Sequence, residues 1–155
     1  MYEYGNLIEL LTPQFKIIAY CIMPDHYHLL VQATLSSEIS NYISKIENSY
    51  TRFYNMRNLR KGPLWQSAFR CARIVSNEQL LHVVRYIHLN PVTSNLVTNP
   101  RQWLYSSHNL YLQQPILNKA KIISIKTVKK FEQFILNNID HQKRLRVIKS
   151  ALRDY

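Results

Sequence analysis

The chain of 155 residues contains only two glycines, Gly5 and Gly62, and two cysteines, Cys21 and Cys71. Two glycines are too few for the glycine-rich loops that hold phosphates in P-loop and dinucleotide-binding proteins. Because no CxxC pair occurs, the cysteines are predicted to be buried thiols in a reducing cytosol, and neither a disulfide nor a zinc site. The sequence has no run of 18 apolar residues and no signal-like opening. We therefore expect a cytoplasmic protein without a membrane partner.

Acidic residues are also scarce, with nine Asp and Glu against twenty Lys and Arg, which gives a formal net charge of +11. Such a balance indicates a polyanionic partner, most often nucleic acid, although a generally basic proteome would produce it too. Eleven tyrosines accompany these basic residues. Flat aromatic rings stack on unpaired bases, so this combination favours a single-stranded substrate.

Apolar patterning predicts both strands and helices. The predicted elements are strands 16–23 and 26–33, helices 37–59, 76–90 and 127–137, an extended segment 64–74, and a loop 92–113 with the aromatic anchors Trp103, Tyr105 and Tyr111. A tight turn at Pro24-Asp25 joins the strands. The second helix begins with an S-x-x-Q capping box at Ser76 and is predicted to end at Asn90-Pro91, because proline cannot continue the helical hydrogen bonds.

Two histidines, His26 and His28, open the second predicted strand. Side chains alternate across a strand, so both imidazoles project from one face while Tyr27 points away. Two imidazoles at this spacing can share one divalent ion. Two strand histidines hydrogen-bonded to water would give the same pattern.

The second helix places His82, Tyr86 and Asn90 four residues apart, one above another on one face. A tyrosine hydroxyl is a weak nucleophile until a metal or a base activates it or its target. A divalent ion held by His26 and His28 would polarise a phosphate for attack by Tyr86, with an oxygen of Asn90 as third ligand. Tyr86 alone is also consistent with ordinary packing.

A set of basic residues is available to follow a phosphate backbone. These predicted DNA contacts are Lys45, Arg52, Arg60, Lys61, Arg70 and Arg73. Trp65 and Phe69 lie among them and are predicted to pack in the core in preference to stacking on a base.

Five blocks of the sequence, in this order, resemble the single-tyrosine HUH transposases of the IS200-like and REP-associated type. The blocks are residues 19–31 (AYCIMPDHYHLLV), 49–55 (SYTRFYN), 62–70 (GPLWQSAFR), 86–92 (YIHLNPV) and 103–107 (WLYSS). Together they extend over about 90 residues and form a highly specific pattern.

The resemblance implies an α+β, ferredoxin-like HUH fold, with an antiparallel sheet and helices packed on one face. It implies a metal-dependent transposase that cuts single-stranded or hairpin DNA through a 5′-phosphotyrosine intermediate and rejoins it at the free 3′-OH. His26 and His28 match the metal pair of the family, Tyr86 its nucleophile, and Asn90 the polar group near the metal. Mg²⁺ or Mn²⁺ would suffice as cofactor, and such a protein is expected at the nucleoid.

On this resemblance, residues 1–113 form the catalytic domain. Residues 114–155, where the composition shifts to Lys, Ile and Asn, form a basic helical extension. Family members usually begin with a strand ahead of the first block, whereas this chain reaches the histidine strand within 26 residues. A strand beside the histidine strand is therefore expected to be missing, and a homodimer could cover the open edge.

Three other functions remain open from the sequence. A catalytically inactive descendant of such a transposase would bind hairpin DNA through its basic face without cutting it. A replication initiator or a relaxase shares the chemistry, but fits the W-Q and Y-I-x-L-N-P blocks poorly. A two-histidine phosphoesterase would need a second H-x-T/S element, which the sequence does not contain. Attack by Tyr86 within one protomer and attack across a dimer both remain open.

Overall fold

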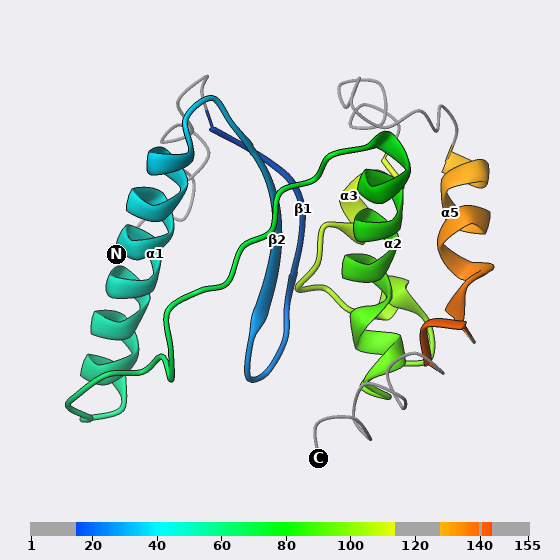
Figure 1. The fold of residues 1–155 in the computed structure, drawn as a ribbon. Helices are drawn as coiled ribbons and strands as arrows, with labels where there is room; N and C mark the ends of the chain where they lie inside the picture. Colours follow the sequence, from blue (N-terminus) through cyan, green and yellow to red (C-terminus); the bar gives the residue numbers. More distant parts are fainter. Residues whose placement is uncertain (1–14, 114–127, 140, 144–155) are drawn as a thin grey trace, which may run out of the picture. The chain divides into compact units, whose positions relative to one another are not determined.

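The computed structural model describes residues 15–113, 128–139 and 141–143 (Figure 1). In chain order the elements are β1 (Phe15–Ile22), β2 (Tyr27–Ala33), α1 (Ser36–Arg57), α2 (Asn77–Thr93), η2 (Pro100–Gln102), α3 (His108–Tyr111) and α5 (Val128–Leu136). Strands and helices together confirm the predicted α+β class. The chain divides into two compact units, one of Met1–Lys16 with Gln32–Arg73, the other of Ile17–Val31 with Ile74–Tyr155.

The strands β1 and β2 pair with each other to form a hairpin. The amide of Met23 donates a hydrogen bond of 2.8 Å to the carbonyl of His26. This bond closes the tight turn and confirms the prediction made from Pro24-Asp25. The turn therefore brings the first histidine directly to the start of β2.

A second segment pairs with β1 along the edge that β2 leaves open. The amide of Ile22 donates to the carbonyl of Tyr105 over 2.8 Å, and the amide of Ser107 donates to the carbonyl of Tyr20 over 3.0 Å. An antiparallel bridge joins Cys21 to Ser106, which lies between Tyr105 and Ser107. Because residues 105–107 supply these bonds, β1 has hydrogen-bonding partners on both sides.

The helix α2 begins where the capping sequence predicts. The hydroxyl of Ser76 accepts a hydrogen bond of 3.1 Å from the amide of Gln79. The return bond of a capping box shifts by one residue, because the Gln79 side chain accepts from the amide of Val75, at 2.8 Å. These two bonds satisfy the amides of Gln79 and Val75 at the helix start.

The helix α2 continues to Thr93, so the predicted end at Asn90-Pro91 was wrong. Proline lacks an amide proton and therefore removes one helical hydrogen bond. The carbonyl of Asn90 nevertheless accepts from the amide of Ser94 over 2.9 Å and from the hydroxyl of Thr93 over 3.1 Å. These bonds hold the last turn, so the helix extends past the fully buried Pro91.

The core of the second unit joins the hairpin to α2, α3 and α5. Its buried hydrophobic members are Ala19, Cys21, Met23, Leu30, Leu80, Val84, Ile87, Leu89, Tyr111, Phe131 and Ile135. The helix α5 confirms the helix predicted over 127–137 and lies beside α2 (Figure 1). The domain boundary at residues 113 and 114 remains a prediction, because residues 114–127, 140 and 144–155 lie outside the described residues.

The first unit consists of α1 followed by an irregular segment through residue 73. The side chain of Asn55 donates to the carbonyl of Gly62 over 2.8 Å and accepts from the guanidinium of Arg60 over 2.9 Å. Gly62 has φ +93, a left-handed conformation that L side chains rarely adopt. These bonds fold the chain back onto the end of α1. Residues 64–74 belong to no helix and no strand, and their extended conformation stays a prediction.

Three further predictions need correction or qualification. The loop predicted over 92–113 contains η2 and α3. Tyr105 is largely exposed and is no anchor. Cys71 is exposed, whereas Cys21 is buried as predicted, and burial raises the pKa of the Cys21 thiol to about 12. In the part of the chain that the structure describes, no helix is long and apolar enough to cross a bilayer.

Candidate active site

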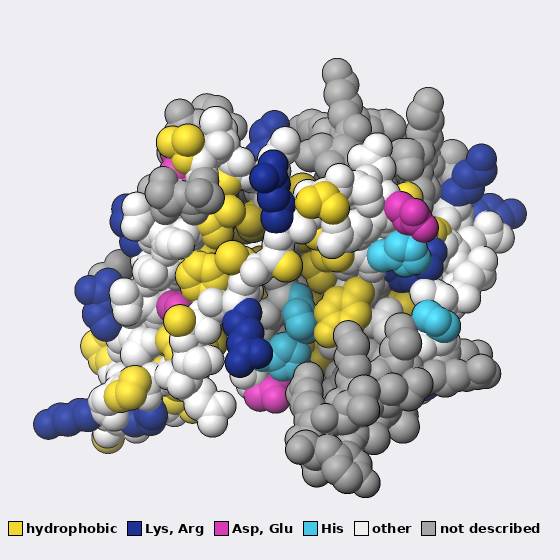
Figure 2. Space-filling view, viewed as in Figure 1, with side chains coloured by type: hydrophobic (Ala, Val, Ile, Leu, Met, Phe, Trp, Pro, Cys, Tyr) yellow, Lys and Arg dark blue, Asp and Glu magenta, His cyan; other side chains and the backbone are white. Residues whose placement is uncertain are grey.

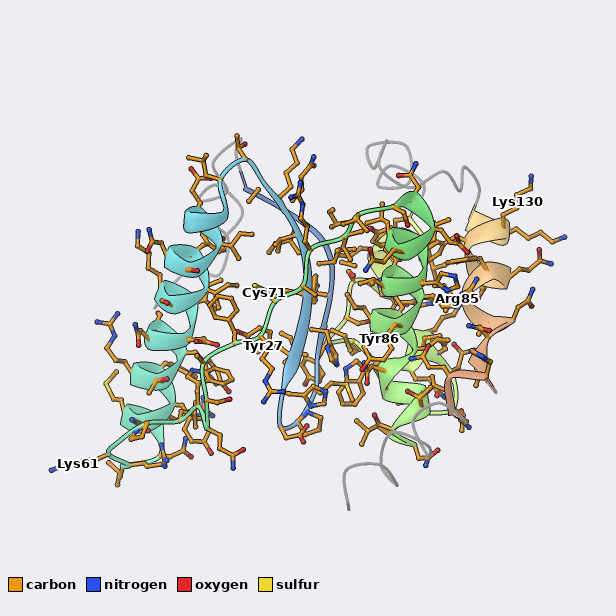
Figure 3. All side chains as sticks on the ribbon, in the orientation of Figure 1. Tyr27, Lys61, Cys71, Arg85, Tyr86 and Lys130 are labelled. Atoms are coloured by element: carbon orange, nitrogen blue, oxygen red, sulfur yellow. The ribbon has the colours of Figure 1, made fainter. Side chains whose placement is uncertain are left out.

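His26 and His28 converge at the turn end of the hairpin. Their Nε2 atoms lie 3.1 Å apart, and the ring planes meet at 87°. Tyr27 lies on the opposite side of the hairpin, as the alternation of side chains predicts (Figure 3). Two imidazole nitrogens directed at a common point are a donor set that suits a divalent transition ion, with the remaining positions open.

A carboxylate holds the first of these histidines in place. The Nδ1 atom of His26 lies 2.6 Å from Oδ1 of Asp25. An ionised carboxylate only accepts hydrogen bonds, so this contact places a proton on Nδ1, and in the neutral imidazole the lone pair then lies on Nε2. The sequence analysis did not identify Asp25, although a carboxylate directly before an H-x-H pattern is a recognisable signal. Histidine side chains with an acidic neighbour reach the surface in Figure 2.

Tyr86 completes the group that the sequence analysis predicted. Its ring centroid lies 5.2 Å from that of His28, at an interplanar angle of 76°. Tyr86 is 41% exposed. Figure 3 shows it on the side of α2 that faces the hairpin, while Arg85 faces α5, where its guanidinium lies over the ring of Phe134. The exposed His82 pairs with Glu78 at 3.8 Å, one turn from Tyr86 along the helix.

Asn90 lies on α2 one turn after Tyr86 and is 3% exposed. Among the described residues its side-chain nitrogen has no hydrogen-bond partner, which is unusual for a buried amide. An amide oxygen and two imidazole nitrogens are chemically compatible with Mg²⁺ or Mn²⁺. Within the described residues, no group of three or more His, Cys, Asp or Glu side chains could hold a metal. The assignment of Asn90 as a ligand remains a prediction.

A buried hydrogen-bond chain fastens α2 to β1. The Nε2 atom of His88 lies 2.8 Å from the hydroxyl of Ser107. That hydroxyl accepts from the amide of Tyr20 over 2.9 Å and donates to the Tyr20 carbonyl over 3.2 Å. Because a hydroxyl has a single proton, His88 must donate its Nε2 proton to Ser107. The helix of Tyr86 and the hairpin of the histidine pair are thereby tied together.

Two of the buried histidines in this region are uncharged at neutral pH. Burial lowers the pKa of His88 well below its ordinary value, and the neighbouring His108 lowers it further. The pKa of His108 is lowered to about 4, mainly by burial. The carboxylate of Glu132 raises this pKa by a smaller amount, and the guanidinium of Arg101 lowers it. Both rings contact Phe131, so they act as packed parts of the core.

Gln142 contacts the backbone of the candidate nucleophile. Its side-chain nitrogen donates a hydrogen bond of 3.2 Å to the carbonyl of Tyr86, and its side chain is buried. The contact joins residues that are 56 positions apart. No local pattern indicated it, so the sequence analysis did not identify Gln142.

All six predicted DNA-contacting residues lie in the first unit. Lys45 and Arg52 line an open pocket on α1. The guanidinium of Arg60 is engaged by Asn55 and by the carbonyl of Pro63, at 2.9 and 2.7 Å. Lys61, Arg70 and Arg73 are exposed. The indole of Trp65 is partly buried and donates to the carbonyl of Glu47 over 3.2 Å.

Comparisons with known proteins identify relatives of the chain. The sequence model of the family described as "Transposase IS200 like" matches residues 10–90. A Haemophilus influenzae protein named "Putative REP-associated tyrosine transposase" is 32% identical over 105 residues, which cover 60% of this chain and 58% of that protein. The Escherichia coli "REP-associated tyrosine transposase" is 24% identical over 94 residues, 60% of this chain and 54% of that protein. The chain thus spans just over half the length of these relatives. No solved structure matches it.

Proposed function

Because the chain belongs to the IS200-like transposase family, we propose that it cuts and rejoins single-stranded DNA through a covalent bond to Tyr86. One observation carries the proposal: the Nε2 atoms of His26 and His28 converge to 3.1 Å beside the exposed ring of Tyr86. An exposed tyrosine beside two converging nitrogen donors is what a phosphate transesterification requires.

The reaction exchanges one phosphodiester bond for another. The Tyr86 oxygen loses its proton and bonds to phosphorus, and the bond from phosphorus to the 3′ oxygen breaks. The 3′ oxygen takes up a proton and leaves as a free hydroxyl, while the 5′ end stays on Tyr86. Attack by a 3′-OH on that phosphotyrosine reverses the exchange, so no nucleotide cofactor is needed.

The residues of the chain would hold Mg²⁺ or Mn²⁺ at this place. His26 and His28 would supply nitrogen ligands and Asn90 an oxygen. When bound, the ion would neutralise charge on the scissile phosphate and align it for in-line attack. The buried bond of His88 to Ser107 supports this role, since it fixes the helix of Tyr86 against the hairpin.

The proposal is tested with purified protein and an end-labelled hairpin DNA that has single-stranded flanks. With Mn²⁺ we expect a slowly migrating, protease-sensitive band on a denaturing gel, and EDTA should remove it. A protein that binds the DNA and yields no such band with either Mn²⁺ or Mg²⁺ would instead be the inactive hairpin-binding descendant.

The basic residues of α1 are proposed to contact phosphates. Replacing Lys45 or Arg52 by alanine should weaken DNA binding for all sequences alike and lower the salt dependence of the binding constant by about one ion per residue. Binding measured by fluorescence anisotropy over a range of salt concentrations tests this. The matched control is Arg101→Ala, because that guanidinium is paired with the carboxylate of Glu132, at 2.7 and 2.8 Å. Equal salt slopes for Lys45→Ala, Arg52→Ala and the unmodified protein would contradict the assignment.

A further inference from the structure

Three side chains form a continuous hydrogen-bonded row at the hairpin turn. Asp25 contacts Nδ1 of His26 at 2.6 Å, and Nε2 of His26 contacts Nε2 of His28 at 3.1 Å. Both contacts use ring nitrogens, so the proton positions on the two rings depend on each other. The row begins at the ionised carboxylate of Asp25, which can only accept hydrogen bonds.

We propose that Asp25 is a positioning residue that sets the tautomers of both histidines and thereby directs the His26 lone pair to the shared point. The proposal rests on the proposed function, because that function gives the shared point its use. Metal-bound histidines commonly donate their second ring nitrogen to a carboxylate, and this contact fixes the ring orientation and raises its basicity. The geometry assigns that part to Asp25.

The proton positions follow from the row. His26 donates from Nδ1 to Asp25, so in the neutral imidazole its Nε2 atom has no proton and accepts from His28. His28 therefore carries its proton on Nε2 in the metal-free protein. To present a lone pair from the same atom, His28 must lose that proton to water and take one up on Nδ1. The net charge of His28 is unchanged by this exchange. His26 already presents its lone pair on Nε2, so only His28 changes tautomer when an ion binds.

An exposed carboxylate beside an exposed histidine can also be a weak surface pair of little consequence. The chain contains a matched example of that case, because Glu78 lies 3.8 Å from His82 in the same unit. Replacing Glu78 removes one negative charge near an exposed histidine without touching the row. It therefore separates loss of charge from loss of the contact to His26.

The first measurement uses side-chain nitrogen NMR of the full-length, metal-free protein, which distinguishes the histidine tautomers directly. We expect His26 as the Nδ1–H form and His28 as the Nε2–H form. Asp25→Ala should shift His26 towards the Nε2–H form, while Asp25→Asn keeps an accepting oxygen and should largely retain the original form. Glu78→Ala should leave both spectra unchanged. An unchanged His26 tautomer in Asp25→Ala would overturn the proposal.

The second measurement is Mn²⁺ affinity, followed by titration calorimetry. Asp25→Ala should weaken binding by about 10- to 100-fold, the usual effect of losing such a partner, and Glu78→Ala should not change it. Equal affinities of Asp25→Ala and the unmodified protein would overturn the link between tautomer and metal. If the unmodified protein bound no Mn²⁺ while the tautomers still followed Asp25, the proposed function would fail and the orienting role of Asp25 would stand.

Discussion

Replacing Tyr86 by phenylalanine is expected to abolish the covalent protein–DNA adduct completely. The substitution removes a single oxygen, and that oxygen is the atom proposed to bond to phosphorus. The ring itself remains, so its edge contact with His28 should persist. Because Tyr86 is 41% exposed and is not a member of the buried core described above, the variant should fold as stably as the unmodified protein.

The experiment compares Tyr86→Phe with Tyr105→Phe on the denaturing gel. Tyr105 is an exposed tyrosine of the same unit, with a relative exposure of 64%. It pairs with β1 through its backbone carbonyl, which the substitution does not change. Tyr105→Phe should form the adduct as the unmodified protein does. DNA binding, measured without denaturant, should be nearly the same for all three proteins. Adduct formation by Tyr86→Phe would exclude Tyr86 as the nucleophile.

Acid is expected to destabilise the protein strongly over the range from about pH 6.5 to about pH 4. A histidine in an unfolded chain has a pKa near 6.5, whereas burial lowers the pKa of His108 to about 4 and that of His88 well below 6.5. Between these values the unfolded chain binds more protons than the folded one, so the free energy of unfolding falls as the pH falls. Above about pH 6.5 this contribution is constant.

The size of the effect follows from the same pKa difference. For His108 alone, the lowering from 6.5 to about 4 corresponds to roughly 3 kcal/mol, at 1.36 kcal/mol per pH unit. Glu132 opposes this lowering and Arg101 adds to it, and these two residues also pair with each other at 2.7 Å. Burial is the largest cause, so the net direction is clear.

Urea unfolding near pH 7 and near pH 4 measures this loss. His108→Leu should lose less stability on acidification, because the unfolded chain no longer gains a proton at that position. His82→Ala is the control, since His82 is exposed and should leave the pH dependence as it is. An identical acid loss in His108→Leu and the unmodified protein would show that His108 does not drive it.

Local patterns predicted the parts of the fold that depend on neighbouring residues. The hairpin, α1 and α5 follow from apolar spacing, and the start of α2 follows from Ser76 and Gln79. The end of α2 could not be predicted in this way. Pro91 is tolerated because bonds to the Asn90 carbonyl hold the last turn and because the ring is buried in a core assembled from distant segments.

The candidate site divides in the same way. His26, His28 and Tyr86 were identified from spacing and from resemblance, and the structure brings these three side chains together. Gln142 was not identified, because its contact with the Tyr86 carbonyl depends on how the chain returns after 56 residues. The link of His88 to Ser107 has the same origin. Such contacts depend on tertiary packing, which a single sequence without alignment does not reveal.

The pairing of β1 with residues 105–107 has a consequence for synthesis on the ribosome. Tyr20 and Ser107 are separated by 87 positions. At about 5–20 residues per second, the ribosome needs roughly 4–17 s to extend the chain from Tyr20 to Ser107. During that interval β1 has made its hairpin with β2, but its other edge still presents unpaired amides and carbonyls. Exposed strand edges are templates for intermolecular pairing. The growing chain is therefore most vulnerable to aggregation, and most dependent on chaperones, before residue 107 has been added.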